Sequence, residues 1–210
     1  MVNICVLVSG GGTNLQALID YEKQNKSCPY HIALVISSSK NAYALERAAL
    51  SKIKTEITSP YSVMGKEKAV NASIEEKRLA VSDAVLSLCK KNNIEAIVLA
   101  GFLTVLSGSI VKEYSNRILN LHPALLPKFG GVGMWGHNVH EAVIAAGEKE
   151  SGATVHLVDA GCDTGKILAQ CKVPVLADDT PDTLYARIAP HEHELMVKGT
   201  CMLSQMIAEK

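Results

Sequence analysis

The sequence predicts a single α/β domain built on a mainly parallel, doubly wound sheet, with helices on both faces and a long C-terminal helix. Apolar runs of strand length alternate with segments of helical spacing through the first 122 residues, which is typical of parallel strands joined by helical crossovers. The apolar runs are almost uninterrupted, as expected of strands that are covered on both faces. Beyond residue 137 the pattern changes to a helix, two strands close in sequence and one long final helix.

Each expected element has its own pattern. Continuous apolar runs predict strands over residues 3–10, 31–38, 55–59, 95–101 and 117–122. Apolar residues at helical spacing predict helices over residues 14–25, 42–53, 66–91 and 107–116. In the second part we expect a helix over 138–149, strands over 152–159 and 166–175, and the final helix over 180–210. Thr180 and Pro181 suit the start of that helix, because proline is favoured in the first helical turn.

The composition is that of a globular protein without a strongly charged partner surface. Of the 210 residues, 48% are hydrophobic, and 21 basic residues balance 21 acidic ones, so a nucleic-acid or membrane partner has no electrostatic support. No apolar run reaches the length of a membrane span, and the chain begins directly with a strand rather than a targeting segment. No repeat or linker divides it, and the glycine-rich segment 127–138 is expected to be mobile or to cover substrate.

The cysteines favour a reducing, cytoplasmic location. None belongs to a C-x-x-C pair, and several lie in apolar contexts where a reduced thiol acts as a small hydrophobe. The six are Cys5, Cys28, Cys89, Cys162, Cys171 and Cys201.

Glycines at positions 10–12 join the first strand to the first helix. Such a turn leaves backbone N–H groups free at the positive end of a helix, which suits a phosphate, and Thr13 and Asn14 can cap the helix and donate further hydrogen bonds. The dinucleotide-binding fingerprint does not fit, because Leu15 occupies the third glycine position, and no lysine pair with serine or threonine completes a P-loop. A purely structural tight turn also explains the pattern.

The strand at residues 117–122 ends in two polar side chains. Asn120 and His122 project from one face because side chains alternate along a strand, about 7 Å apart. Ligands of parallel α/β sheets bind beyond the carboxyl ends of the strands, and two donors there suit an oxyanion that develops on a carbonyl. An isolated histidine would more often be structural, but its pairing with an amide just before Pro123 favours catalysis.

Two acidic residues are further candidates. Asp163 follows the strand that contains His156 and lies in a glycine-flanked turn, where aspartate is also common for conformational reasons. Glu192 has apolar neighbours in the final helix, where a buried carboxylate needs partners, although a solvent-exposed helix face explains it equally well. We expect no metal site, because no cysteine or carboxylate stands at ligand spacing from the remaining histidines. These are His137, His140, His191 and His193.

Together these segments resemble the folate-dependent formyltransferases of purine biosynthesis. The resemblance covers nearly the whole chain and rests on VLVSGGGTNLQALID, SSSKNAYALERA, VLAGFLTVLS, ILNLHPALLP, GATVHLVDAGCDTGKILAQ and EHEL, in the family's order and near its spacing. It implies one Rossmann-like formyltransferase domain, with a nucleotide-phosphate half over residues 1–100 and a folate-binding and catalytic half over 101–210. The implied substrates are glycinamide ribonucleotide and 10-formyltetrahydrofolate, without a metal, in a monomer or homodimer.

The resemblance also implies roles for individual residues. The catalytic group would be Asn120, His122 and Asp163. The substrate-binding residues would be Gly12, Thr13 and Asn14 at the phosphate, Glu192 at the ribose hydroxyls, and Arg78, which falls where the family has a substrate-contacting arginine. The folate would lie against Leu103, Thr104, Val105, Leu106, Asn120, Asp159 and Asp163.

The implied reaction is direct attack of the substrate amine on the formyl carbon. Asn120 and a protonated His122 would stabilise the oxyanion, while Asp163 would orient or charge His122 and carry the amine proton to N10 of the folate. No serine or cysteine nucleophile is needed, so Cys162 is expected to be a bystander.

Other functions stay open. Methionyl-tRNA formyltransferases and formyltetrahydrofolate deformylases share an Asn-His-Asp site, but we expect a basic tRNA-binding domain in the former and an N-terminal regulatory domain in the latter. A non-catalytic α/β module that binds a phosphorylated nucleoside gives no role to Asn120, His122 or Asp163. An assay with both substrates separates these alternatives.

Overall fold

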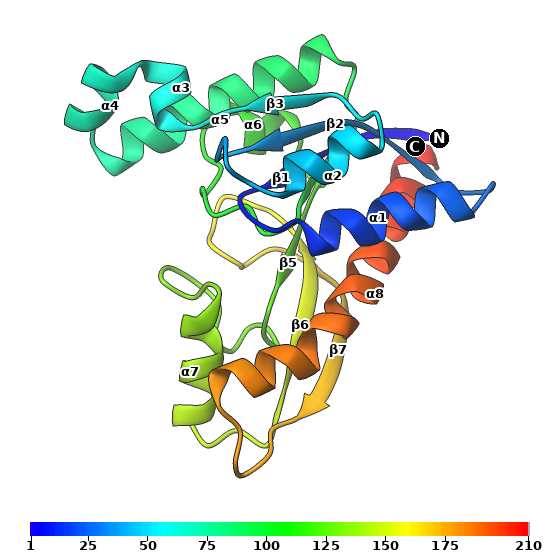
Figure 1. Ribbon diagram of the computed structural model, residues 1–210, viewed down its shortest axis with the longest axis vertical. Helices are drawn as coiled ribbons and strands as arrows, with labels where there is room; N and C mark the ends of the chain where they lie inside the picture. Colours follow the sequence, from blue (N-terminus) through cyan, green and yellow to red (C-terminus); the bar gives the residue numbers. More distant parts are fainter. Residues whose placement is uncertain (210) are drawn as a thin grey trace.

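The computed structural model describes residues 1–209 and confirms an α/β fold around one seven-stranded sheet (Figure 1). The strands are β1 (Val2–Val8), β2 (Tyr30–Ser37), β3 (Thr55–Ile57), β4 (Ala96–Leu99), β5 (Ile118–His122), β6 (Glu150–Leu157) and β7 (Ile167–Pro174). The helices are α1 (Thr13–Gln24), α2 (Ala44–Leu50), α3 (Pro60–Met64), α4 (Lys66–Asn71), α5 (Ile74–Lys91), α6 (Ser109–Glu113), α7 (His137–Ala145) and α8 (Pro181–Ala208).

The sheet is mainly parallel and doubly wound, as predicted. Its order is β3-β2-β1-β4-β5-β6-β7, and every pairing from β3 to β5 is parallel. The last two pairings, of β5 with β6 and of β6 with β7, are antiparallel. From β1 the chain builds outward through β2 to β3, then returns to the other side of β1 with β4. The boundary between β1 and β4 is therefore the topological switch point, beside which ligands bind in such sheets.

Each face of the sheet buries its own apolar cluster. Along β1, Ile4 and Val6 face the cluster that α1, α2 and α8 complete, whereas Cys5 and Leu7 face the cluster that α5 and α6 complete. All four side chains have no exposed surface. Because neighbouring residues of a strand point to opposite faces, one continuous apolar run serves both layers, and helices on both faces are confirmed.

The predicted helical segment over 66–91 is confirmed, but a break divides it into two helices, α4 and α5. Between α4 and α5, Ser73 takes an extended conformation and starts α5 with a capping box: Glu76 N–H donates to Ser73 Oγ at 3.2 Å, and Ser73 N–H donates to Glu76 Oε2 at 2.7 Å. The short α3 was not predicted either. It begins with the same device, since Ser59 caps it and Pro60 fills its first turn.

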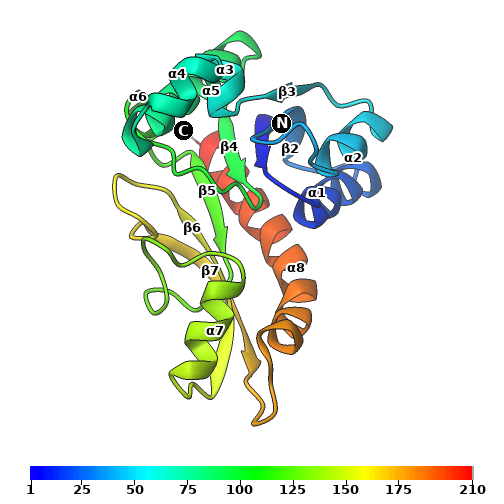
Figure 2. The same cartoon turned by 60° about the vertical axis from the view of Figure 1, so that its left-hand side comes forward.

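The predicted final helix is confirmed through Ala208, and only Lys210 of its predicted range lies outside the described residues. Its 28 residues extend over about 42 Å. Thr180 caps it and Pro181 occupies the first turn, as expected. α8 packs against α7, β6 and β7 at one end and against α1 at the other, so it joins the two halves of the molecule (Figure 2).

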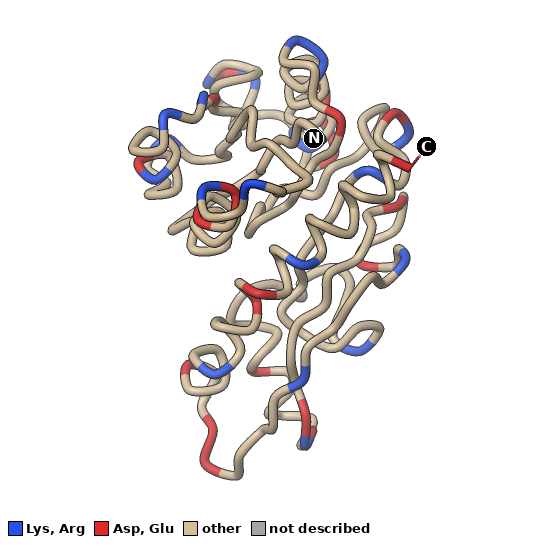
Figure 3. The backbone as a smooth tube through the Cα atoms, turned by 90° about the vertical axis from the view of Figure 1, so that its right-hand side faces the viewer, with Lys and Arg blue, Asp and Glu red and all other residues tan. Residues whose placement is uncertain are grey.

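Charged residues of both signs are distributed over the whole chain. Basic and acidic residues are interspersed along the chain in the view of Figure 3. Among residues 1–209, none of the helices combines the length and the apolar character that a membrane crossing requires.

Candidate active site

The end of β5 carries the predicted amide and imidazole on one face. Asn120 stands beside Leu99 of β4 and directly opposite His156 of β6. Side chains of directly opposed residues in an antiparallel pair share a face, so the Asn120 amide meets the His156 ring, with Nδ2 and Nε2 3.1 Å apart. His122, two residues further along β5, is 3% exposed.

Asp163 joins this group from the hairpin turn between β6 and β7. Its backbone has a φ of +58°, an uncommon value outside glycine that aspartate tolerates better than most residues. Its Oδ2 lies 3.5 Å from His122 Nδ1 and accepts the Gly131 N–H at 3.0 Å, while its Oδ1 lies 3.5 Å from His156 Nε2. The structure thus brings together the three residues that the sequence suggested for catalysis.

His156 is the member of the group that sequence reasoning left without a role. Its Nδ1 lies 3.0 Å from the carbonyl oxygen of Leu157, which can only accept, so Nδ1 carries a proton. Nε2 then accepts one N–H of the Asn120 amide, 3.1 Å away. This contact fixes the orientation of the amide and leaves its second N–H available. The alternation of His156 with Thr154 along the strand was the available signal in the sequence, but its pairing with Asn120 follows only from the strand register.

His122 is held between two acceptors. Nε2–H donates to the Phe129 carbonyl at 2.7 Å, and Nδ1 faces Asp163 at the longer distance of 3.5 Å. Burial lowers the pKa of His122 below its usual value, although the charge of Asp163 and the Phe129 carbonyl both act to raise it. Burial thus outweighs the carboxylate, and before substrates bind the ring is neutral, with its proton on Nε2.

Asp163 is ionised at neutral pH. Burial acts to raise its pKa, but the contact with His156, the Gly131 N–H and the nearby His122 ring act to lower it, and the lowering prevails. Burial also raises the pKa of the neighbouring Cys162 thiol, and the charge of Asp163 raises it further. Cys162 is thus a poor nucleophile. The charge of Arg78, on α5, acts against that rise.

The glycine turn lies at the switch point, after β1. Gly12 has a φ of +73°, and a Cβ built on it would lie 2.6 Å from the Cβ of Ala44, so only glycine fits. The predicted capping of α1 by Thr13 or Asn14 is wrong, because Gly12 itself is the N-cap and no side chain caps the helix. Gly12 turns the chain so tightly that Thr13 is already helical.

Asn14 and Glu192 meet between α1 and α8. Glu192 is 6% exposed, so its carboxyl is buried and does not lie on a solvent-exposed helix face. Burial raises the pKa of Glu192 to about 7, against a hydrogen bond from Asn14 that lowers it. The Oδ1 atom of Asn14 is buried and has no hydrogen-bond partner among the described residues. Asn14 Oδ1 and the Glu192 carboxyl are thus buried acceptors with few donors around them, and hydroxyl groups of a ligand would satisfy them.

The residues predicted to contact the folate lie mainly in two places, the segment after β4 and the hairpin turn after β6. Leu103 and Val105 are 63% and 41% exposed, so they offer apolar surface, whereas Thr104 is half-buried and Leu106 is buried. The Leu103 N–H donates to Ser9 Oγ at 3.0 Å, which ties this segment to the end of β1. In the hairpin turn, Asp159 Oδ1 accepts bonds from the Gly161 N–H at 3.0 Å and from Thr164 Oγ1 at 2.7 Å. A cavity of about 340 Å³ opens beside this turn and includes Asp163 in its lining.

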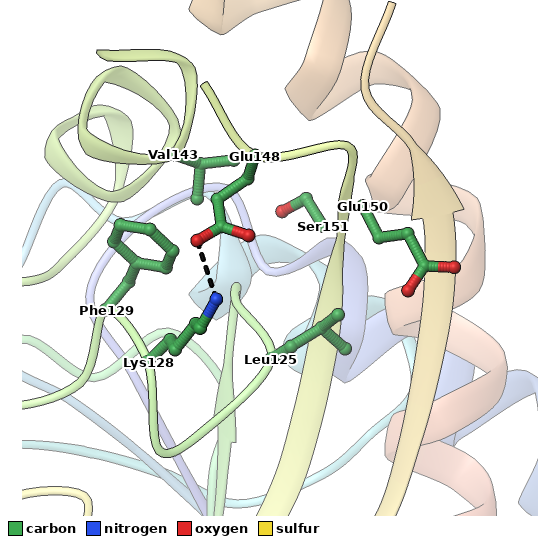
Figure 4. Close-up of a pocket in the computed structure, with 7 residues that line it drawn as sticks. All are labelled: Leu125, Lys128, Phe129, Val143, Glu148, Glu150 and Ser151. Carbon is green, nitrogen blue, oxygen red and sulfur yellow. Dashed lines mark hydrogen bonds and ion pairs between the residues drawn. The ribbon is translucent and has the colours of Figure 1, made fainter. Parts of the chain in front are cut away.

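The glycine-rich loop after β5 reaches two of the three catalytic candidates: Phe129 contacts His122, and Gly131 contacts Asp163. Next to it lies a cavity of about 190 Å³ lined by Phe129, Val143 and Ser151, across which Lys128 and Glu148 form an ion pair at 2.8 Å (Figure 4). The pair ties the start of the loop to the segment after α7.

The four histidines for which the sequence offered no ligand spacing do not form a cluster. His137 Nε2 lies 3.2 Å from Asp182 Oδ1, and the buried ring of His140 packs against Tyr185, so both serve the contact of α7 with α8. His191 is exposed and His193 half-buried, on either side of Glu192. Within residues 1–209 no three metal-binding side chains come together.

Comparisons with known proteins agree with this architecture. The profile of the formyl transferase family matches residues 2–200. The chain is 36% identical to phosphoribosylglycinamide formyltransferase of Escherichia coli over 194 residues, 92% of this chain and 83% of that protein. It is 37% identical to a trifunctional purine biosynthetic protein of Drosophila melanogaster over 216 residues, which is 99% of the chain but 15% of the length of that protein.

Solved structures extend the likeness to three dimensions. The glycinamide ribonucleotide transformylase 1 of Symbiobacterium toebii superposes with a TM-score of 0.84 at 33% identity, covering 98% of this chain and 88% of that one. The phosphoribosylglycinamide formyltransferase of Brucella melitensis gives 0.81 at 36% identity, covering 97% and 95%.

The doubly wound sheet carries its candidate site where β1, β4 and β5 end, beside the switch point, as is typical of α/β enzymes. The match over residues 2–200 and the identity to its members then decide the family: the chain belongs to the formyl transferases.

The geometry predicts a positioning role for His156. His156→Phe keeps the ring volume but removes the acceptor that orients Asn120 and the contact to Asp163, so kcat should fall about tenfold to a hundredfold with little change in KM. His140→Phe is the matched control, since that buried ring makes no recorded hydrogen bond, and its kcat should stay near the starting value. Steady-state kinetics check this; a folded His156→Phe protein with unchanged kcat would remove His156 from the account.

Proposed function

We propose that this chain transfers the formyl group of 10-formyltetrahydrofolate to the amine of glycinamide ribonucleotide, giving formylglycinamide ribonucleotide and tetrahydrofolate in purine biosynthesis. The observation that carries the proposal is the convergence of Asn120, His122 and Asp163 at the end of β5 in a chain of the formyl transferase family. An amide donor, an imidazole and a carboxylate are the groups that direct acyl transfer to an amine requires.

In the proposed reaction the substrate amine attacks the formyl carbon, and the formyl oxygen becomes an oxyanion. The free N–H of the Asn120 amide and the N–H of His122 stabilise this charge. The Nε2–H of His122 is bonded to the Phe129 carbonyl, so the oxyanion takes over this donor only when that carbonyl moves aside. A negative charge close to His122 raises its pKa, so the proton that the amine releases to Asp163 can pass to Nδ1 of His122, 3.5 Å away, while the oxyanion exists, and it returns through Asp163 to N10.

Asp163 transfers the proton in this reaction. The attacking amine loses one proton, and N10 of the folate gains one as its bond to the formyl carbon breaks. Asp163, ionised and 3.5 Å from His122, accepts the first and delivers the second, directly or through water. No covalent enzyme intermediate forms, and the route uses no metal; holding both substrates in line supplies much of the acceleration.

The two halves of the chain divide the binding in this proposal. The phosphate of the ribonucleotide lies at Gly12, Thr13 and Asn14, its ribose hydroxyls donate to Glu192, and Arg78 contacts the substrate from α5. The half at 101–210 contributes Glu192 to the ribonucleotide and holds the folate. Its pterin lies against the backbone of residues 103–106 and the 159–163 turn, where the exposed Leu103 and Val105 provide apolar contact.

Mixing the protein with both substrates and following folate release by absorbance tests the reaction. Release should require the ribonucleotide; release from 10-formyltetrahydrofolate alone would indicate a hydrolase. Asp163→Asn should lower kcat about a hundredfold or more, because the amide cannot accept the proton. Asp178→Asn, an exposed change in the β7–α8 segment, is the control. Turnover that survives in a folded Asp163→Asn protein would contradict the assigned role.

A pH dependence follows from Glu192. With its pKa raised to about 7, the carboxyl loses its proton as the pH rises through 7, and the carboxylate accepts ribose hydroxyls better than the acid does. The KM for glycinamide ribonucleotide should therefore fall between pH 6 and 8, approaching tenfold per unit at most, about the effect of one bound proton. In Glu192→Gln this part of the slope should vanish, while the titration of the substrate phosphate stays common to both proteins. Equal slopes would exclude Glu192 as the titrating group.

A further inference from the structure

We propose that Arg47 of α2 is a positioning residue for the substrate phosphate, because it sets the direction in which the glycine turn presents its N–H groups. This proposal rests on the proposed function and adds a residue that lies outside the turn itself. Arg47 reaches from α2 to the turn, where its Nε–H donates to the Gly11 carbonyl at 2.9 Å and its Nη1 donates to Gln16 Oε1 at 3.1 Å.

Because of the geometry of the peptide bond, the contact of Arg47 with the Gly11 carbonyl fixes the direction of the Gly12 N–H. In a planar trans peptide the C=O and the following N–H point to opposite sides. The Gly11 carbonyl points to Arg47, so the Gly12 N–H points away from α2. The preceding peptide is held in the same way, since the Ala44 N–H donates to the Gly10 carbonyl at 3.1 Å.

Both consecutive carbonyls of the turn are therefore bound to α2, and both N–H groups are directed to the opposite side. Successive N–H groups that converge in this manner make a concave site for an anion. Among the described residues no acceptor is recorded for the N–H groups of Gly11 or Gly12. Contact with Ala44 prevents any larger residue at position 12, so α2 determines the shape of the turn as well as its orientation.

Arg47 is also a cation without a carboxylate partner in any ion pair recorded for residues 1–209. It is held over the ring of Tyr43, 5.0 Å from the centroid, and by Gln16, whose Nε2 donates in turn to Asp20 at 2.8 Å. A guanidinium keeps its charge at all physiological pH values. Its field therefore adds to the attraction that the start of α1 exerts on a phosphate.

The test compares two substrates, glycinamide ribonucleotide and the same molecule without its phosphate. Arg47→Met should lower kcat/KM for the phosphorylated substrate about tenfold to a hundredfold, the effect of losing a charge-assisted hydrogen bond, through a rise in KM. The values for the unphosphorylated substrate and for 10-formyltetrahydrofolate should change little. Equal losses for both substrates, or no loss, would overturn the proposal, because a merely structural role does not distinguish them.

Arg117→Met is the matched control. Arg117 also lies over a tyrosine ring, 4.8 Å from the centroid of Tyr114, and donates to the carbonyls of Glu95 and Glu113, but it stands at the opposite end of the sheet, just before β5. Arg117→Met should leave unchanged the ratio of kcat/KM for the phosphorylated substrate to kcat/KM for the unphosphorylated one. If Arg47→Met does not fold by circular dichroism, Arg47→Lys replaces it: lysine keeps the charge without the fork that spans Gly11 and Gln16, so the ratio should still fall, and a wild-type ratio would overturn the proposal.

Failure of the proposed function is recognised separately, since the unmodified protein would then not formylate glycinamide ribonucleotide. In that case titration of inorganic phosphate by calorimetry decides the role of Arg47. Phosphate should bind to the unmodified protein and to Arg117→Met, and at least tenfold more weakly to Arg47→Met. Equal affinity in the three proteins would overturn it.

Discussion

The candidate active site depends on the position of β5 between a parallel neighbour, β4, and an antiparallel neighbour, β6. Its parallel pairing with β4 places the end of β5 at the edge where β1 and β4 also end, beside the glycine turn. Its antiparallel pairing with β6 sets Asn120 opposite His156 and leads the chain into the hairpin turn that carries Asp163. A one-residue shift of that register would turn His156 to the other face of the sheet and leave the Asn120 amide without its acceptor.

Burial then determines the charge of each group. It raises the pKa of Glu192 to about 7 and lowers that of His122, while the hydrogen bonds around Asp163 keep this carboxyl ionised. The site thus rests with one carboxylate near a neutral imidazole, and a developing oxyanion supplies the negative charge that favours imidazolium. The same low-polarity surroundings strengthen the hydrogen bonds that Asn120 and His122 make to that oxyanion.

Local patterns predicted most of the fold and part of the site. Apolar runs gave the strands and the layers, and alternation placed Asn120 and His122 together on β5. The break at Ser73 was missed although Ser73 and Glu76 form a capping box, because the helical pattern continued across it. His156 and the neutral state of His122 depend on strand register and on burial, which arise only when distant segments pack. The contact of Arg47 with Gly11 joins residues 36 positions apart and has no local signature.

The central claim is that the formyl oxygen is held at the end of β5. A crystal structure with glycinamide ribonucleotide and a non-transferable analogue of 10-formyltetrahydrofolate tests it most directly. The formyl oxygen should lie about 2.7–3.1 Å from Asn120 Nδ2 and from a nitrogen of His122, with the Phe129 carbonyl displaced. The substrate amine should lie within reach of Asp163. A formyl oxygen that contacts neither Asn120 nor His122, with the amine in line for attack, would contradict the account.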